Sequence, residues 1–377
     1  MNALGGFVWA VISFLLVIGP LIFIHEMGHY LVGRWCGVKA EAFSIGFGKE
    51  VFGWTDKRGT RWKLAALPLG GYVRFAGDMN PASQPSPEWL ALPAEERRQT
   101  FQAKPVWQRF LIVLAGPATN FLFAFVVIAG VLMTYGEPVT PPVISQVMPN
   151  SAAATAGLQP GDRIVSLNGE KTRRFEDVGF YTALHPDMDM RIDLIRAGRP
   201  LTLIAHARAE TETDQFGNQT RIGRLGIRPT GGAMQPVPLV EVPGRSVDLV
   251  VDSVKTTLTA IGQIIGGERS AKELSGPVGM AKVAGEQATL GWFAVVLLMV
   301  GISINLGFIN LLPIPMLDGG HLLFYIVEAV RRKPVEPQVQ EWAFRSGLAL
   351  LLCLMLFVTF NDLGSAGLWQ KLAGLIG

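Results

Sequence analysis

Residues 7–33, FVWAVISFLLVIGPLIFIHEMGHYLVG, combine a long apolar run with a short cluster of ionisable side chains. No charged residue occurs between Phe7 and Ile24, and about 20 apolar residues suffice for a helix to cross a bilayer. The run therefore predicts a membrane-spanning helix, with the ionisable cluster His25-Glu26-Met27-Gly28-His29 in its second half. Ionisable residues inside such a helix are costly and indicate a functional site by default.

The spacing of this cluster predicts a metal site. Residues four apart share one face of a helix, so His25 and His29 can reach the same ion. Glu26 lies on the adjacent flank, where it can hold or deprotonate a metal-bound water. Zinc suits two imidazoles with a position left open for water, and we expect one Zn²⁺ per chain. The alternative is a chance match in a chain with 5 His, which the apolar setting makes rare.

The composition indicates a membrane protein with a soluble portion. The 377 residues are long for one domain, and 49% of them are hydrophobic. A net charge of +3 gives no indication of a nucleic-acid partner, so none is expected. The two cysteines, Cys36 and Cys353, suggest neither a disulfide framework nor a zinc-type pair. No Lys or Arg precedes the first apolar run, so we expect this segment to be retained rather than removed as a signal peptide.

Four apolar segments divide the chain into seven regions. Basic residues gather after the first segment and at Arg331-Arg332-Lys333, whereas residues 136–161 contain no Lys or Arg. The positive-inside rule then places 36–109 in the cytoplasm and 136–288 across the membrane. Glycine-rich turns and alternating runs predict β-hairpins in the first of these loops. The expected regions are membrane helices at 1–35, 110–135, 289–330 and 341–362, a cytoplasmic hairpin loop at 36–109, a folded domain at 136–230, and an amphipathic helical linker at 231–288.

The region 136–230 has the pattern of a small α+β domain. Residues 157–169, GLQPGDRIVSLNG, predict a tight turn, a strand and an Asn-Gly hairpin turn. This succession resembles a PDZ domain of the bacterial, circularly permuted kind, and such domains bind an extended peptide along a sheet edge. Residues 223–227 are either the site for such a peptide or simply the last strand of the domain.

The third apolar segment ends in a second polar cluster, Asn310-Leu-Leu-Pro313-Ile-Pro315-Met-Leu-Asp318-Gly319. The two prolines break the helix and give Asp318 freedom to turn inward. Asp318 could complete a zinc site with the two histidines or cap the next helix, and the first pattern favours the zinc site. His321 is a rival ligand and the weaker candidate. Asn120, after Gly116-Pro117 in the second segment, predicts a hydrogen bond between helices.

Together, H-E-x-x-H, G-P-x-x-N, one PDZ unit and N-x-x-P-x-P-x-L-D-G resemble the bacterial site-2 protease family, in a single-PDZ form of the regulator-of-sigma-E-protease type. The resemblance implies a four-helix membrane bundle with an inserted PDZ-like α+β domain and a cytoplasmic, membrane-associated β-hairpin loop. It implies Glu26 as the catalytic carboxylate and a loop containing Gly46-Phe47-Gly48 that binds substrate. The implied zinc ligands are His25, His29 and Asp318, and the implied substrate contacts include Asn305 and Asn310.

This resemblance implies an intramembrane zinc metalloprotease of a bacterial inner membrane. Its expected substrates are single-span membrane proteins such as anti-sigma factors or signal-peptide remnants, cut within the bilayer. Asn310 would help to stabilise the charge on the carbonyl oxygen during catalysis. The active site is expected near the cytoplasmic side and the PDZ unit, with any bound peptide or protein segment, in the periplasm. A metal transporter and a PDZ-bearing binding protein are the alternatives that use the same His and Asp residues.

Overall fold

The structure is a computed structural model that describes residues 3–77, 93–213, 219–267, 270–271 and 274–365. The chain folds into two compact units that each gather segments distant in sequence. The helical unit comprises Met1–Ile128, Leu249–Val254 and Ser275–Leu363, and the sheet unit comprises Ala129–Asp248, Lys255–Leu274 and Gly364–Gly377.

Four helices in the described part of the chain are long and apolar enough to cross a membrane, as the sequence predicts. Two begin at or beside a proline, Pro105 for the second and Pro337 for the fourth, because proline fits the first turn of a helix. These starts explain why both helices are longer at their N-terminal ends than predicted. The four are α1 (Ala3–Trp35), α4 (Val106–Tyr135), α9 (Trp292–Leu311) and α11 (Pro337–Ser365).

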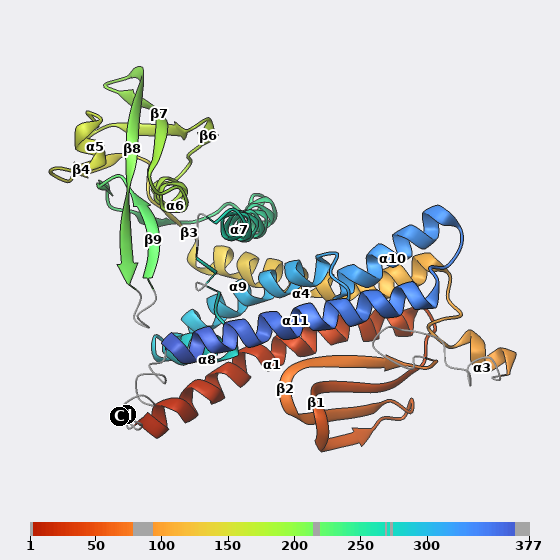
Figure 1. The fold of residues 1–377 in the computed structure, drawn as a ribbon. Helices are drawn as coiled ribbons and strands as arrows, with labels where there is room; N and C mark the ends of the chain where they lie inside the picture. The colour runs from red at the N-terminus through yellow and green to blue at the C-terminus, as the bar shows by residue number, and fades with distance from the viewer. Residues whose placement is uncertain (1–2, 78–92, 214–218, 268–269, 272–273, 366–377) are drawn as a thin grey trace. The chain divides into compact units, whose positions relative to one another are not determined.

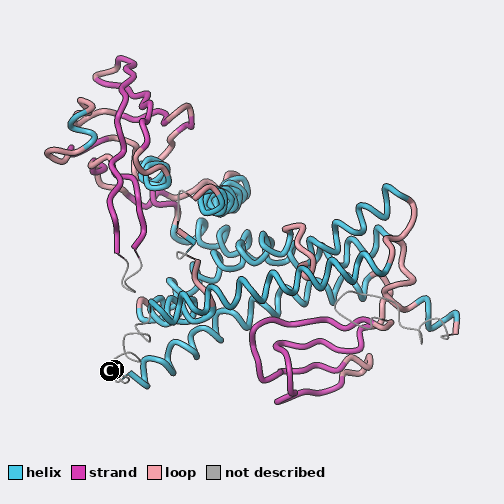
Figure 2. Tube along the Cα trace, in the orientation of Figure 1, coloured by secondary structure: helices cyan, strands magenta, loops and turns pink. Residues whose placement is uncertain are grey.

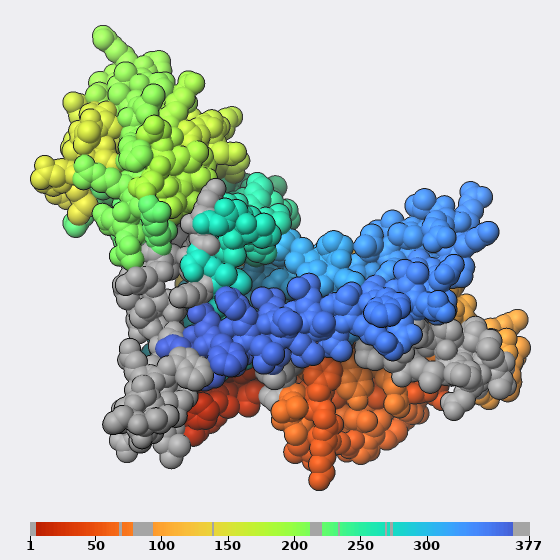
Figure 3. Space-filling view, viewed as in Figure 1, coloured from red at the N-terminus to blue at the C-terminus, as the bar shows by residue number. Residues whose placement is uncertain are grey.

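Apolar side chains on these helices point outward. Figure 3 shows α11, in the darkest blue, running along one face of the helical unit. Leu350, Leu352, Leu354 and Leu356 of this helix are exposed. Exposed leucines in this number suit a surface covered by lipid rather than by water. The chain is therefore a multi-pass membrane protein.

The segment predicted as a third membrane helix at 289–330 consists of two helices, α9 and α10 (Asp318–Arg331). The chain leaves α9 after Leu311 because Pro313 and Pro315 lack the N–H that would continue the helix. The break places Asp318 at the first position of α10. The predicted linker at 231–288 likewise contains two helices, α7 (Val242–Ile265) and α8 (Pro277–Thr289).

The loop after α1 forms a bent sheet beside that helix, built from β1 (Ala40–Thr55) and β2 (Arg61–Phe75) (Figure 1). Both strands fold back, so residues 42–45 pair with 61–64 on one side and with 71–74 on the other. Gly46 and Gly48 lie at the bend of β1 with φ of +92° and +88°, a conformation that glycine adopts without a steric penalty.

Aromatic packing joins this bent sheet to the membrane helices. Tyr30 of α1, Phe43 of β1 and Ile112 of α4 belong to one buried cluster, together with Tyr325 of α10. Tyr30 and Phe43 meet edge to face, with ring centroids 5.9 Å apart. The start of the second helix is held to α10 by the ion pair between Arg109 and Glu328, at 2.6 Å. The cluster fixes β1 and β2 against the half of α1 that carries the histidines.

The sheet unit is built on an antiparallel sheet of order β6-β5-β7-β8-β9, drawn in magenta in Figure 2. Alternate residues Met190, Ile192 and Leu194 of β7 are buried, as expected for a strand with one face on the core. The element bounds are β3 (Glu137–Val139), β4 (Ile144–Val147), α5 (Ala152–Thr155), β5 (Arg163–Leu167), β6 (Glu170–Lys171), α6 (Phe175–Leu184), β7 (Met188–Arg196), β8 (Arg199–Thr213), β9 (Gln219–Arg224), β10 (Ile227–Pro229) and β11 (Ala233–Gln235), and the helical unit also contains α3 (Ala94–Arg98).

Candidate metal centre

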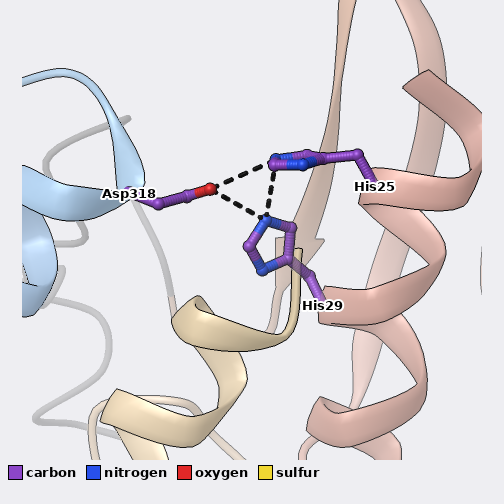
Figure 4. Close-up of side chains that lie close together, drawn as sticks. All are labelled: His25, His29 and Asp318. Atoms are coloured by element: carbon purple, nitrogen blue, oxygen red, sulfur yellow. Dashed lines mark hydrogen bonds and ion pairs between the residues drawn. The ribbon is translucent and has the colours of Figure 1, made fainter. Parts of the chain in front are cut away.

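Two histidines one helical turn apart form one side of the candidate site. His25 and His29 stand on the same face of α1, and their Nε2 atoms lie 3.3 Å apart. Both side chains are buried. Their rings are almost perpendicular, at 83°, so that the two Nε2 atoms converge on one point (Figure 4). The helical spacing of four residues thus produces the geometry that the sequence predicts.

Asp318, at the start of α10, is the third residue of the candidate site. Its Oδ2 atom lies 3.2 Å from His25 Nε2 and 3.5 Å from His29 Nε2 (Figure 4). In the described part of the chain, this is the one set of three His, Cys, Asp or Glu residues that could share a metal ion. His321 lies elsewhere, with its ring 4.9 Å from that of Phe344, so the structure brings Asp318 and not His321 to the histidines.

The spacing of the three atoms fits a zinc ion. Zinc–ligand bonds of about 2.1 Å in a tetrahedral site set the ligand atoms roughly 3.4 Å apart. The observed separations of 3.2, 3.3 and 3.5 Å agree with that value. Asp318 Oδ2 is buried and has no hydrogen-bond partner among the described residues, and such an atom is costly unless a cation satisfies it. Three protein ligands leave the fourth position open, as in catalytic zinc sites.

The second ring nitrogens of both histidines face α4. His29 Nδ1 lies 2.8 Å from the main-chain oxygen of Ile112. A carbonyl oxygen can only accept, so Nδ1 carries the proton and Nε2 is free to bind a metal. His25 Nδ1 lies 3.0 Å from Nδ2 of Asn120, which confirms the predicted hydrogen bond between helices and identifies its partner.

Sequence reasoning missed the connection of Gly116 and Asn120 to the site. A Cβ on Gly116 would overlap His29 Nε2, so this glycine keeps space open beside the metal-facing atom. Gly116 and Asn120 are four residues apart on α4 and meet His29 and His25, which are four apart on α1. That equal spacing is a signal in the sequence that could have linked the two motifs.

Glu26 is buried beside the ligand group but does not belong to it. Its side chain passes close to Gly71 of β2, since a Cβ built there would lie 2.8 Å from Glu26 Cγ. Glu26, which directly follows His25 in α1, therefore has its side chain next to the row 71–74 of the bent sheet. This is a suitable position for a group that exchanges protons with a water and a substrate.

The residues predicted to contact substrate lie in two elements, β1 and α9. Gly46 packs against the main-chain oxygen of Leu67, where a Cβ would approach to 2.8 Å, and Phe47 is paired with Leu67 in the sheet. At the bend of β1 that also contains Gly48, Gly46 and Phe47 therefore contact β2 of the same sheet. Asn305 and Asn310 lie in the second half of α9 and are half-buried.

Comparisons with known proteins agree with this chemistry. Residues 13–354 match the model of a family described as Peptidase family M50. A protein of Agrobacterium fabrum, named as a zinc metalloprotease, is 45% identical over 371 residues, which cover 97% of this chain and 98% of the relative. Metalloprotease MmpA of Caulobacter vibrioides is 38% identical over 395 residues, covering 98% and 99% of the two chains. The matched segment contains His25, His29 and Asp318.

Proposed function

We propose that this chain, which belongs to peptidase family M50, cleaves peptide bonds within the membrane-spanning segments of single-span proteins. The chain is a zinc metalloendopeptidase with helices that can cross a membrane. One observation carries the proposal: His25 and His29 stand inside the apolar helix Gly5–Trp35. Chemistry at these residues therefore takes place at membrane depth. Family membership favours the protease over the metal transporter and the peptide-binding protein.

The site should lie near the cytoplasmic end of α1. His29 precedes Arg34 by five residues and His25 precedes it by nine. At about 1.5 Å of rise per residue, the ligands would be roughly 7–14 Å inside that end. The basic loop after α1 assigns this end to the cytoplasm, so water enters from that side. The localisation that follows is a bacterial inner membrane, with residues 136–230 in the periplasm.

In the proposed mechanism, His25, His29 and Asp318 hold the zinc. When bound, zinc polarises a water and lowers the pKa of that water towards neutrality. Glu26 accepts a proton from the attacking water at its carboxylate and returns it to the leaving amine nitrogen. Asn310 donates its amide hydrogen towards the carbonyl oxygen on which negative charge develops.

An edge of the bent sheet is the proposed guide for the substrate. A peptide bond in a helix must be drawn into an extended form before it can be attacked, and each unpaired backbone group within a membrane costs several kcal/mol. Row 71–74 has one partner row among the described residues, 42–45, and it runs beside Glu26. We assign strand addition to this row, with Gly46, Phe47 and Gly48 shaping the bend behind it.

The sheet unit offers a second contact for a polypeptide. A groove of about 560 Å³ lies between α6 and residues 222–227, with Ser151, Val178 and Thr182 in its lining. The PDZ resemblance and this groove support binding of an extended segment, such as the outer part of a substrate. We propose that it selects among single-span substrates, including anti-sigma factors or remnants of signal peptides, rather than taking part in hydrolysis.

The proposal is tested with the full chain purified in detergent and loaded with zinc. A set of single-span proteins is incubated with the parent and with Glu26→Gln, and the products are measured by mass spectrometry. We expect the parent to cut inside the apolar span and the variant to leave the substrates intact. Cleavage only outside the spans, or equal products from both proteins, would refute intramembrane hydrolysis by this site.

A further inference from the structure

The two metal-facing histidines have outer partners of different chemical kinds. His29 Nδ1 meets the main-chain oxygen of Ile112 at 2.8 Å, and that oxygen can only accept a hydrogen. His25 Nδ1 meets the side-chain amide of Asn120, whose nitrogen lies 3.0 Å away. An amide can donate through Nδ2 or accept through Oδ1. The protonation site of His25 therefore depends on which end of this amide faces it.

The main chain of Asn120 makes a contact with α9 that does not depend on its side chain. Its main-chain oxygen accepts a hydrogen bond from Ser303 Oγ at 2.9 Å, which joins α4 to α9. The residue is fully buried, and its Oδ1 atom has no hydrogen-bond partner among the described residues. A buried amide oxygen without a donor costs about 1–3 kcal/mol. Oδ1 of Asn120 is therefore available to accept a hydrogen bond, and the backbone that carries this side chain is fixed.

We propose that Asn120 is a positioning residue that presents Oδ1 to His25 Nδ1 when the metal is bound. This inference rests on the proposed function, in which His25 is a zinc ligand. A neutral imidazole carries one proton, and if Asn120 donates through Nδ2, that proton must sit on Nε2. There it would point at the metal position and at Asp318. Rotating the amide by half a turn exchanges its oxygen and nitrogen, moves the proton to Nδ1 and frees Nε2.

An amide is well suited to this task. Unlike a carboxylate, it accepts the hydrogen without adding a charge to a buried site that already contains Glu26 and Asp318. Rotation gives Oδ1 a donor in His25 Nδ1–H, and Nδ2 takes the position that Oδ1 holds in the described structure. The alternative is that Asn120 only joins two helices, in which case any side chain of its size and shape would preserve metal binding. The two explanations make different predictions for zinc affinity.

The experiment measures zinc affinity by chelator competition on the full chain in detergent. Asn120→Leu keeps the size and removes the acceptor, and we expect zinc to bind about 10–100-fold more weakly, as for lost outer-shell partners. Asn120→Asp keeps an acceptor, and because bound zinc offsets the added negative charge, we expect its zinc affinity to equal or exceed that of the parent. Thr119→Val is the matched control, because it removes a different hydrogen bond between α4 and α1, from Thr119 Oγ1 to the oxygen of Ile24. It should retain the parental affinity.

Cobalt substitution provides a second readout that helix packing would not move. We expect the visible absorption bands of bound Co²⁺ to shift in Asn120→Leu and to stay near the parental positions in Thr119→Val. Parental affinity and spectrum in Asn120→Leu would overturn the inference. If that variant does not fold, Asn120→Asp decides, because a loss of about 10-fold or more there contradicts an acceptor role.

His25→Ala separates this inference from the proposed function. If His25→Ala keeps the parental zinc affinity, the ligand assignment fails and the role of Asn120 fails with it. If His25→Ala loses zinc while Asn120→Leu retains it, only the role of Asn120 is wrong. None of these measurements depends on peptide hydrolysis.

Discussion

Each unit of the molecule contains an aspartate with a buried carboxylate oxygen, but the two differ in their hydrogen-bond partners. In the sheet unit, Asp162 is fully buried and accepts hydrogen bonds from Arg196 Nε and Nη2, both at 2.7 Å, and from the Gln159 N–H at 2.9 Å. In the helical unit, Asp318 Oδ2 has no hydrogen-bond partner among the described residues. Its neighbours there are the Nε2 atoms of His25 and His29.

We interpret Asp162 as a structural carboxylate and Asp318 as a candidate metal ligand. Most buried polar atoms in folded proteins are hydrogen-bonded, and an exception requires an explanation. Asp162 has permanent donors that neutralise it, so its role is complete within the fold. Asp318 faces two imidazoles that are neutral when they act as ligands, so its charge remains to be balanced by a cation. The comparison predicts that equal substitutions at the two aspartates will affect different properties.

The largest expected effect follows from replacing each aspartate by asparagine. Asp318→Asn removes an anionic ligand, so zinc affinity should fall by at least about 100-fold, more than is usual for an outer-shell partner, and cleavage should disappear with it. Asp162→Asn should leave both properties unchanged at neutral pH. Metal analysis after dialysis and a substrate assay measure the two effects. A metal-free Asp162→Asn protein, or a zinc-loaded Asp318→Asn protein, would contradict the distinction.

A third buried carboxylate, Glu26, sharpens the comparison because it neighbours the ligands without belonging to them. Glu26→Gln preserves size and removes the proton acceptor, so we expect cleavage to fall by about 10²–10⁴-fold. Zinc content should stay at the parental level, which distinguishes Glu26 from Asp318. Loss of zinc in this variant would show that Glu26 acts as a ligand.

A smaller effect is expected from adding one methyl group next to the site. A Cβ on Gly116 would overlap His29 Nε2, whereas a Cβ on Gly130 of the same helix meets nothing within 4 Å. Gly116→Ala should displace the imidazole and weaken zinc binding by about 10-fold or more. Gly130→Ala is the matched control and should bind zinc as the parent does. Equal zinc affinities in both variants would show that His29 can shift without losing the metal.

The sequence was sufficient to predict the four membrane helices, because a charge-free run of this length has few other interpretations. It also predicted the three residues that the structure brings together, because H-E-x-x-H fixes two of them by helical period alone. Predicting Asp318 required a further observation, because this residue lies far from His25 in the sequence. Only the proline break indicated that Asp318 could turn inward.

The surroundings of these residues could not be predicted in the same way. Contacts of Gly116 with His29, Asn120 with His25 and Gly71 with Glu26 depend on how α4 and β2 pack against α1. No local periodicity encodes such packing, although the equal spacing on α1 and α4 hinted at it. The substrate role of Gly46, Phe47 and Gly48 stays a prediction: the glycine pattern identified a bend in β1, whereas the close approach of Gly71 to Glu26 depends on how the sheet packs against α1.

The last effect concerns the stability of the sheet unit at low pH rather than the metal site. Burial by itself raises the pKa of Asp162, but the hydrogen bonds from Arg196 and Gln159 and the charge of Arg196 together hold that pKa below its usual range. In the unfolded chain the pKa of an Asp is about 3.9, so the folded unit binds its proton less readily than the unfolded chain does. The stabilisation is therefore fully present above about pH 5 and is lost as the pH falls through the lower, folded-state pKa.

Hydrogen exchange of the intact chain, followed by mass spectrometry of peptides from residues 144–211, measures this dependence. We expect protection of the parent to decline as the pH falls below about 4, once exchange rates are corrected for the intrinsic effect of pH. Asp162→Asn should be less protected at neutral pH, by about 1.5–3 kcal/mol for a lost hydrogen bond to a charged group, and should show a flatter pH profile. A parent and a variant with parallel profiles would show that the Asp162–Arg196 pair does not stabilise this unit, and the contrast with Asp318 would then rest on the metal site alone.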